Sequence, residues 1–217
     1  MTAMILAAGL GTRMRPLTNH TPKPLLEVGG KPLILWHIEN LKASGFTNIV
    51  INVAYLGQQI IDYLGDGSEY GVKIYFSDEQ SEGALETAGG IIKALPLLSE
   101  TFLVVNGDVW TDFNYNSNFE LEENLLAHLV LIDNPEHNPT GDFFLSNSEL
   151  KYTFSGIGYY SKKMFEGVKY GKQSLVPLLF KAIDEGYLTT EHYAGVWHDI
   201  GTPERLEELD KLFLNAL

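Results

Sequence analysis

The chain begins with an apolar run, Met4 to Ala8, that passes directly into a loop punctuated by glycine. Five consecutive apolar residues predict a buried strand, and Gly9 and Gly11 allow the following backbone to adopt positive φ angles and to expose its N–H groups. Many α/β proteins turn in this way after a strand without binding a nucleotide. The strand and glycine loop therefore indicate an α/β fold. They predict a bound nucleotide only if other residues supply groups that bind phosphate.

Positive charge gathers in and after this loop, although the formal net charge of the chain is -13. Two of the three arginines, Arg13 and Arg15, lie here, and Lys23 follows ten residues after Arg13. Guanidinium and ammonium groups neutralise phosphate oxygens, so the loop predicts a cradle for a triphosphate. The spacing is neither that of a P-loop nor, with Met14 in place of glycine, that of a dinucleotide fingerprint.

Beyond the loop, β-rich runs alternate with segments of helical periodicity, as in a doubly wound sheet. Further strands are predicted at 49–53, 73–76, 101–105, 127–132, 142–145 and 153–160, with another ending at Trp197. Helices are predicted at 32–44, 58–64, 88–98, 174–185 and 202–214, the last capped by Thr202 with Pro203 in its first turn. We therefore predict a three-layer Rossmann-like α/β fold with a mixed, mostly parallel sheet and helices on both faces. One domain is expected over residues 1–217, with halves of about 1–108 and 109–217.

Composition excludes several classes of protein. The strong negative charge disfavours a nucleic-acid surface, and the absence of cysteine removes disulfides, thiolate nucleophiles and cysteine zinc sites. No run of eighteen apolar residues and no basic segment ahead of the first apolar run is present, so we expect a cytoplasmic protein without a membrane partner. No H-x-x-x-H spacing occurs, which disfavours a histidine metal site. Ser155 lies outside any G-x-S-x-G elbow, which disfavours a serine hydrolase.

Two aspartates are candidate metal ligands. Asp108 follows an apolar strand, at the carboxyl edge where open α/β sheets bind ligands, and Asp199 follows a later predicted strand. Two carboxylates together with nucleotide phosphates are a common way to hold Mg²⁺. Either aspartate could instead cap the turn that follows it. Of the histidines, only His198 is expected near this site, and structural roles are favoured for all of them.

A glycine-rich segment, Glu79 to Gly90, connects a predicted strand to a helix. It holds Gly83, Thr87, Gly89 and Gly90, so its backbone and short side chains could reach the edge of a planar base. An acidic, solvated loop explains the same composition equally well.

The segments LAAGLGTRMRPLT, TPKPLL, ETAGGI, VNGDV and WHDIGTPE together resemble the sugar-1-phosphate nucleotidylyltransferases across nearly the whole chain. The resemblance implies the nucleotide-diphospho-sugar transferase type of fold, with a nucleotide-binding first half and a small sugar-phosphate-binding lobe in the second. It also implies Mg²⁺-dependent attack of a sugar 1-phosphate oxygen on the α-phosphorus of a nucleoside triphosphate, with release of pyrophosphate.

The resemblance assigns roles by position. Arg13, Lys23, Asp108 and Asp199 are the expected catalytic residues, and the two aspartates are the expected Mg²⁺ ligands. The expected nucleotide-binding residues are Ala8, Gly9, Gly11, Thr12, Arg13, Lys23, Glu79, Gly83 and Thr87, and the expected sugar pocket holds Asn106, Gly141 and Ser155. Arg205, on the last predicted helix, is expected to matter little.

Within the family, a further set of segments looks most like the branch that uridylylates N-acetylmuramate α-1-phosphate in cell-wall recycling: INVAYLGQQI, LETAGGIIKALPLL, VNGDVWTDF, AHLVLIDNPEHNPTGDF, TFSGI and EHYAGVWHDIGTPERL. Gly83-Ala84 replaces the usual Glu-Pro before Leu85, and the second half has no E-x-K-P segment, so the base and the sugar-phosphate ligand stay open. Mannose-1-phosphate guanylyltransferase and glucose-1-phosphate thymidylyl- or uridylyltransferase are alternatives on the same core. A non-catalytic nucleotide-sugar sensor is a third, disfavoured because all four expected catalytic residues are present.

The sequence does not give the oligomeric state. Five lysines in the second half are either a countercharge for the lactyl carboxylate of a muramic acid or ordinary solvated surface: Lys151, Lys162, Lys163, Lys169 and Lys172.

Overall fold

The computed structural model describes residues 1–145 and 148–215. The strands are β1 (Thr2–Leu6), β2 (Glu27–Val28), β3 (Lys31–Pro32), β4 (Asn48–Val53), β5 (Lys73–Asp78), β6 (Thr101–Asn106), β7 (Val109–Thr111), β8 (Ala127–Ile132), β9 (Phe143–Phe144), β10 (Lys151–Ser161), β11 (Leu188–His192) and β12 (Trp197–Asp199). The helices are α1 (Leu33–Ala43), α2 (Gly57–Leu64), α3 (Glu86–Ala94), α4 (Val176–Asp184) and α5 (Pro203–Asn215). Among these residues, no helix has the length and apolar character needed to cross a membrane.

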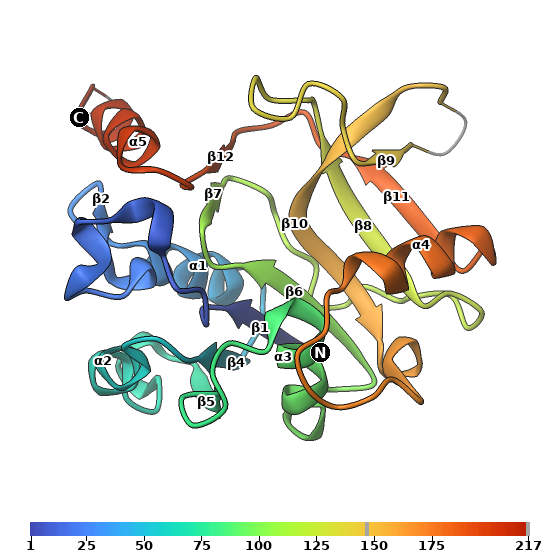
Figure 1. Cartoon of the computed structure of the whole chain (residues 1–217), viewed down its shortest axis with the longest axis horizontal. Helices are drawn as coiled ribbons and strands as arrows, with labels where there is room; N and C mark the ends of the chain where they lie inside the picture. The colour runs from blue at the N-terminus through green and yellow to red at the C-terminus, as the bar shows by residue number, and fades with distance from the viewer. Residues whose placement is uncertain (146–147, 216–217) are drawn as a thin grey trace.

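One central sheet runs through both halves of the chain, in the order β11-β8-β10-β6-β1-β4-β5, with β9 beside β10 (Figure 1). β1, β4, β5 and β6 are mutually parallel, as are β8 and β11. β10 runs antiparallel to both of its long neighbours, β6 and β8. The prediction of a mixed, mostly parallel sheet is confirmed.

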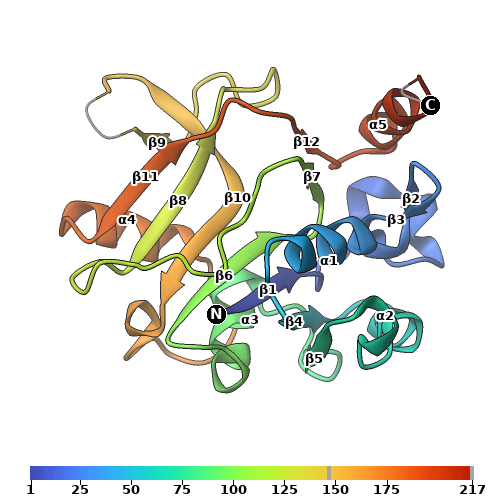
Figure 2. The same ribbon diagram turned by 180° about the vertical axis from the view of Figure 1, so that it is seen from behind.

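Side-chain alternation along the strands builds a core on each face of the sheet. Ile5 of β1 packs with α1 and α2, whereas its neighbour Met4 packs on the opposite face with α3 and α4. β6 repeats the pattern, with Val105 on the first face and Val104 on the second. Because both faces are covered, the strands read as almost continuous apolar runs. The view from behind shows α1 lying across the sheet (Figure 2).

A third, smaller core ties the two ends of the chain together. Met14 of the first loop, Val28 of β2 and Leu209 of α5 are buried in one cluster. The amide of Gly29 also donates a hydrogen bond of 2.8 Å to Asp210 Oδ1. The last helix therefore braces the glycine loop and the β2–β3 hairpin.

Two predicted elements end differently in the structure. The helix predicted over 88–98 begins earlier, at Glu86, and gives way after Ala94 to a 3-10 turn that contains Pro96. Proline has no N–H to continue an α-helix, which explains the change. The strand predicted to end at Trp197 is two strands, because Val196 leaves the central sheet: its N–H donates to Asp112 Oδ1 (2.8 Å) and its C=O accepts from Thr111 Oγ1 (2.7 Å). Trp197 then pairs with β7.

Candidate active site

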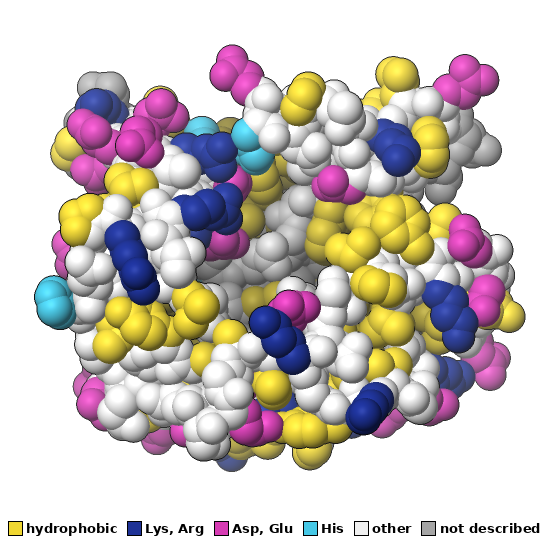
Figure 3. Space-filling view, viewed as in Figure 1, with side chains coloured by type: hydrophobic (Ala, Val, Ile, Leu, Met, Phe, Trp, Pro, Cys, Tyr) yellow, Lys and Arg dark blue, Asp and Glu magenta, His cyan; other side chains and the backbone are white. Residues whose placement is uncertain are grey.

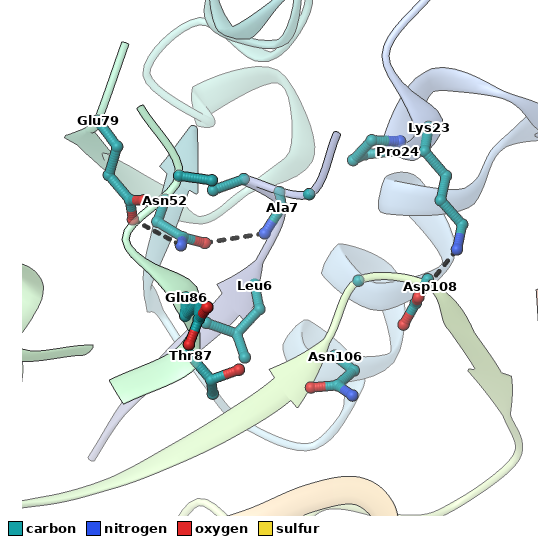
Figure 4. Close-up of a pocket in the computed structure, with 14 residues that line it drawn as sticks. Leu6, Ala7, Lys23, Pro24, Asn52, Glu79, Glu86, Thr87, Asn106 and Asp108 are labelled. Atoms are coloured by element: carbon teal, nitrogen blue, oxygen red, sulfur yellow. Dashed lines mark hydrogen bonds and ion pairs between the residues drawn. The ribbon is translucent and has the colours of Figure 1, made fainter. Parts of the chain in front are cut away.

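A cavity of about 240 Å³ opens at the carboxyl ends of β1 and β6 (Figure 4). The residues that line it are Leu6, Ala7, Ala8, Gly9, Lys23, Pro24, Asn52, Glu79, Ala84, Glu86, Thr87, Asn106, Gly107 and Asp108. Seven of them were predicted from the sequence as site residues: Ala8, Gly9, Lys23, Glu79, Thr87, Asn106 and Asp108. The parallel strands thus bring the glycine loop, the 79–90 segment and the turn after β6 to one place, which we call the first cavity.

The glycine loop folds back on itself beyond the cavity wall. Gly11 has a φ angle of 61°, a left-handed conformation that glycine adopts at low cost. A Cβ atom there would also lie 2.9 Å from Thr18 Cγ2. The Thr18 hydroxyl donates a hydrogen bond of 2.7 Å to the Gly11 carbonyl. The loop is therefore fixed by its own side chains, with Ala8 and Gly9 facing the cavity.

Arg13 and its neighbour Thr12 belong to a short 3-10 turn and are exposed, outside the described lining of the first cavity. Gly83 also lies outside that lining, in the exposed part of the 79–90 segment. The roles assigned to these residues stay predictions.

A buried hydrogen-bond chain crosses the floor of the first cavity. Asn52, near the end of β4, accepts a bond from the Ala7 amide through Oδ1 and donates one to Glu79 Oε1 through Nδ2, both at 2.8 Å. Glu79 Oε2 accepts a further bond of 2.9 Å from the Leu85 amide. Both carboxylate oxygens of Glu79 are therefore used inside the protein, which suits holding the 79–85 segment in place rather than reading a base.

Asn52 is not among the site residues predicted from the sequence. The available signal is an amide side chain inside the apolar run of β4, a position that calls for a buried hydrogen-bond partner.

Lys23 and Asp108 form an ion pair at the mouth of the first cavity, with 2.8 Å between Lys23 Nζ and Asp108 Oδ2. Beneath them, His37 of α1 is buried, and its ring lies against the backbone of Gly107 and Val109. Burial lowers the pKa of His37 to about 4, against a weaker opposing effect of the Asp108 charge. His37 is accordingly a neutral, structural residue near neutral pH, as expected from the sequence.

Pairing of β12 with β7 brings the second aspartate to the same edge. Asp199 is opposite Val109, and the Ile200 amide donates a hydrogen bond of 2.8 Å to the Asp108 carbonyl. The backbones of the two aspartates, 91 positions apart in the chain, are therefore adjacent, although only Asp108 contributes to the lining of the first cavity. That the two carboxylates hold one metal ion stays a prediction.

The partners of Asp199 differ from those expected. Arg205 of α5 donates from Nη1 to Asp199 Oδ2, a contact that was not predicted from the sequence. The small effect expected for Arg205→Ala stays a prediction. His137 Nε2 lies 3.4 Å from Asp199 Oδ2, whereas the ring of His198 lies beside Trp110. The histidine that contacts Asp199 therefore comes from the 134–141 loop and is not its neighbour in sequence, His198.

The carboxylates of Asp108 and Asp199 are suitable ligands for a divalent cation that prefers oxygen atoms and keeps several coordination positions for other ligands. Among the described residues, no group of three or more His, Cys, Asp or Glu side chains could hold a metal ion by itself. Mg²⁺ is commonly bound by one or two carboxylates plus substrate phosphates and water. Asp108 and Asp199 match that requirement, and each carboxylate already attracts a cationic side chain.

A second cavity, of about 470 Å³, adjoins the first and shares Leu6, Thr87 and Asn106 with it. Its remaining lining residues are Val104, Gly141, Asp142, Phe143, Lys151, Phe154, Gly156, Tyr160, Ser174, Leu175, Val176, Leu179 and Phe180. Figure 3 shows the hollow on this face, with hydrophobic side chains gathered on the side of α4. Two of the three predicted sugar-pocket residues, Asn106 and Gly141, line this second cavity.

Ser155, the third, lies outside the described lining of both cavities. It is fully buried, and its hydroxyl donates to the Val130 carbonyl at 2.7 Å. It sits where the pairing of β10 with β8 shifts register, between Phe154 and Ile157. Its hydroxyl therefore supports this β-bulge, and Gly156 lines the cavity in its place.

Comparison with known proteins agrees with the geometry. The nucleotidyl transferase family model matches residues 2–143. The chain belongs to the nucleotidyl transferase family. It is 52% identical over 227 aligned positions to the N-acetylmuramate alpha-1-phosphate uridylyltransferase of Neisseria meningitidis, with 98% of each chain covered. It is 34% identical to the protein of the same name from Caulobacter vibrioides, with 93% of this chain and 92% of the relative covered.

A solved structure shares the fold of this nucleotidyl transferase family member. A putative glucose-1-phosphate thymidylyltransferase from Bacillus anthracis superposes with a TM-score of 0.83 at 23% identity, covering 98% of this chain and 95% of the other. The predicted fold type and the predicted family are therefore confirmed.

Proposed function

We propose that the protein transfers the uridylyl group of UTP to N-acetylmuramate α-1-phosphate, which yields UDP-N-acetylmuramate and pyrophosphate. The observation that carries the proposal is the pair of adjoining cavities: one beside a lysine, two aspartates and a glycine loop, the other large enough for a sugar and lined by both polar and apolar residues. The similarity to the Neisseria uridylyltransferase over nearly the full length of both chains supports this choice of substrates.

The proposed reaction is an in-line displacement at phosphorus. An oxygen of the sugar 1-phosphate forms a bond to the α-phosphorus, and the bond from that phosphorus to the oxygen bridging to the β-phosphate breaks, releasing pyrophosphate. The attacking phosphate is already an anion, so no general base is required, and catalysis rests on positioning and charge neutralisation.

In this proposal, each part of the first cavity has a separate task. The amides of Ala8 and Gly9 lie toward the triphosphate, and Lys23 places its ammonium beside the reacting phosphates. Arg13, at the exposed turn of the loop, offsets charge on the pyrophosphate leaving group. Asp108 and Asp199 would hold Mg²⁺, which when bound supplies further neutralisation between the two anions. Asn106, common to both cavities, lies where the sugar phosphate meets the nucleotide.

The two substrates also suggest a cellular role. N-acetylmuramate is a sugar of the bacterial cell wall, and UTP is a cytoplasmic metabolite. We therefore propose that the protein acts in the cytoplasm, on small-molecule substrates, in peptidoglycan recycling.

The test is pyrophosphate release with Mg²⁺, with UTP, dTTP, GTP, CTP and ATP each offered against the α-1-phosphates of N-acetylmuramate, N-acetylglucosamine, glucose and mannose. The proposal predicts turnover with UTP and the muramic acid substrate well above every other pair. Preference for another pair would keep the nucleotidyl transfer and overturn the substrate assignment, and no release with any pair would favour a nucleotide-sugar sensor.

A further inference from the structure

We propose that Tyr160 selects acceptor sugars that carry an acetamido group, by donating a hydrogen bond from its hydroxyl to the acetamido carbonyl. The inference rests on the proposed function, since it assigns a specificity residue to the same acceptor. It concerns the floor of the second cavity, which we define as Val104, Tyr160, Leu175 and Leu179.

Tyr160 is the one buried polar side chain among the described residues that line the second cavity. It is 1% exposed and packs in the same core cluster as Val104, Leu175 and Leu179. The other polar side chains of the described lining are partly buried or exposed: Thr87, Asn106, Asp142, Lys151 and Ser174. The side chains of the floor are therefore apolar except for the Tyr160 hydroxyl.

This hydroxyl is directed along β10 toward the junction of the two cavities. It reaches back over Gly158, where a Cβ atom would lie 2.7 Å from the hydroxyl oxygen. Gly158 is opposite Val104 of the floor. Two residues further along β10, a Cβ atom on Gly156 would lie 2.6 Å from Asn106 Nδ2. The hydroxyl and the Asn106 amide therefore lie against neighbouring glycines of one strand.

The Tyr160 hydroxyl is available to a ligand. Within residues 1–145 and 148–215, burial alone raises the pKa of Tyr160, with no contribution from a hydrogen bond. The group therefore keeps its proton and can act as a donor. By contrast, the hydroxyl of its neighbour Tyr159 accepts a hydrogen bond of 2.8 Å from the Asn116 amide. Because a buried hydroxyl without a partner is costly, a ligand atom that accepts a hydrogen bond is favoured at this position.

The ligand group at the floor should be uncharged. A carboxylate buried there would need a cation to offset its loss of hydration. Lys151 is the one cationic residue in the described lining, and its ammonium lies 5.3 Å from the ring centroid of Phe144, outside that lining. The charged lactyl group of N-acetylmuramate therefore belongs at the open side of the cavity, and the neutral acetamido group belongs at the floor.

An acetamido group also matches the floor in shape. Its carbonyl accepts the hydrogen bond from Tyr160, while its methyl group contacts the apolar side chains of Leu175 and Leu179. Two residues of a strand span about 7 Å, which sets the separation of the Tyr160 hydroxyl from the Asn106 amide. Because C2 is bonded to C1, a sugar whose 1-phosphate lies near Asn106 can carry its 2-acetamido group toward the hydroxyl.

The test compares Tyr160→Phe with Tyr115→Phe. Tyr115 is the matched control, because its buried hydroxyl also lacks a described partner, but it packs in the core on the other face of the sheet and outside the described lining of both cavities. Neither substitution removes a described hydrogen bond, so both variants should be as stable as the wild type.

For each variant, kcat and KM are measured with UTP against the α-1-phosphates of N-acetylmuramate, N-acetylglucosamine and glucose, the last of which has a hydroxyl in place of the acetamido group. We expect Tyr160→Phe to raise KM about tenfold for both acetamido sugars, with kcat unchanged within about twofold. The KM for glucose 1-phosphate, or its inhibition constant where turnover is too slow, should change less than about twofold. Tyr115→Phe should leave all three sugars within about twofold of the wild type.

A loss confined to the muramic acid substrate would assign the hydroxyl to the lactyl group and overturn the inference. Equal losses on all three sugars, or no loss on any, would overturn it as well. None of these results touches the proposed function, which depends on the preference of the wild type. If the wild type prefers N-acetylglucosamine α-1-phosphate, the proposed function fails, while a tenfold effect of Tyr160→Phe on both acetamido sugars still supports the inference.

Discussion

Asn52 offers a direct test of how the first cavity is held together. Its substitution by leucine, which has a similar volume, leaves packing nearly unchanged but removes two hydrogen bonds of 2.8 Å. The Ala7 amide then has no acceptor, and the Glu79 carboxylate, which is fully buried, loses one of its two donors. A buried neutral group left unpaired costs about 1–3 kcal/mol, and a charged group costs more, so we expect Asn52→Leu to reduce the free energy of unfolding by about 3–5 kcal/mol.

Urea denaturation at 25 °C measures this loss, and the melting temperature should fall by roughly 10 °C, at about 2–4 °C per kcal/mol for a chain of this size. Asn48→Leu is the matched control, because Asn48 lies at the start of the same strand and bonds only to Thr47, at 3.3 Å, on the exposed side. UTP affinity should also weaken in Asn52→Leu, since the network joins two segments of the cavity wall. A loss below about 1 kcal/mol, or an equal loss in both variants, would refute the reasoning.

Three further predictions concern single residues. Arg13→Ala should lower kcat/KM by about 100-fold or more, with normal stability. Lys73→Ala, at the opposite end of the sheet, should leave kcat/KM unchanged. Equal kcat/KM values for the two variants would show that Arg13 does not belong to the site. Glu86, which lines the first cavity, has a φ of 62°, so Glu86→Gly should raise the free energy of unfolding by about 1 kcal/mol. Leu56→Gly (φ 51°) should do the same, but only Glu86→Gly should alter UTP binding. Because burial lowers the folded-state pKa of His37 from 6.5 to about 4, the unfolded chain binds an extra proton between these values, and stability should fall by up to about 3 kcal/mol as pH drops through that window. His37→Gln should flatten that part of a pH series of urea titrations.

The fold could be predicted from the sequence because its signals are local. The apolar runs of the parallel strands and the 3.6-residue periodicity of the helices identify elements that are buried on known faces, and β8 has the bounds that its run predicts. Proline and glycine locate most of the ends. One departure is local, because Pro96 ends the helix predicted over 88–98 early. The other depends on residues distant in sequence, since Thr111 and Asp112 hydrogen-bond to Val196 and draw it out of the central sheet.

The candidate site was less predictable because it depends on contacts between residues that are distant in the sequence. Asp108 and Asp199 can be proposed from strand ends, but their adjacency depends on the pairing of β7 with β12. The contacts of Asp199 with Arg205 and His137 arise from a helix and a loop with no shared pattern. The sequence likewise does not show which of the five lysines of the second half approaches a cavity: only Lys151 belongs to the described lining of the second one, and its ammonium lies over Phe144, outside that lining.

The central claim is that the edge of the sheet bearing Asp108 and Asp199 carries out nucleotidyl transfer with a divalent cation. The most direct measurement is pyrophosphate release from UTP and N-acetylmuramate α-1-phosphate, titrated with Mg²⁺, for the wild type, Asp108→Asn and Asp199→Asn. We predict that both variants stay folded and lose about 100-fold or more in turnover, because each removes a charge from a preorganised site. Rates like those of the wild type in either variant at saturating Mg²⁺ would contradict the assignment.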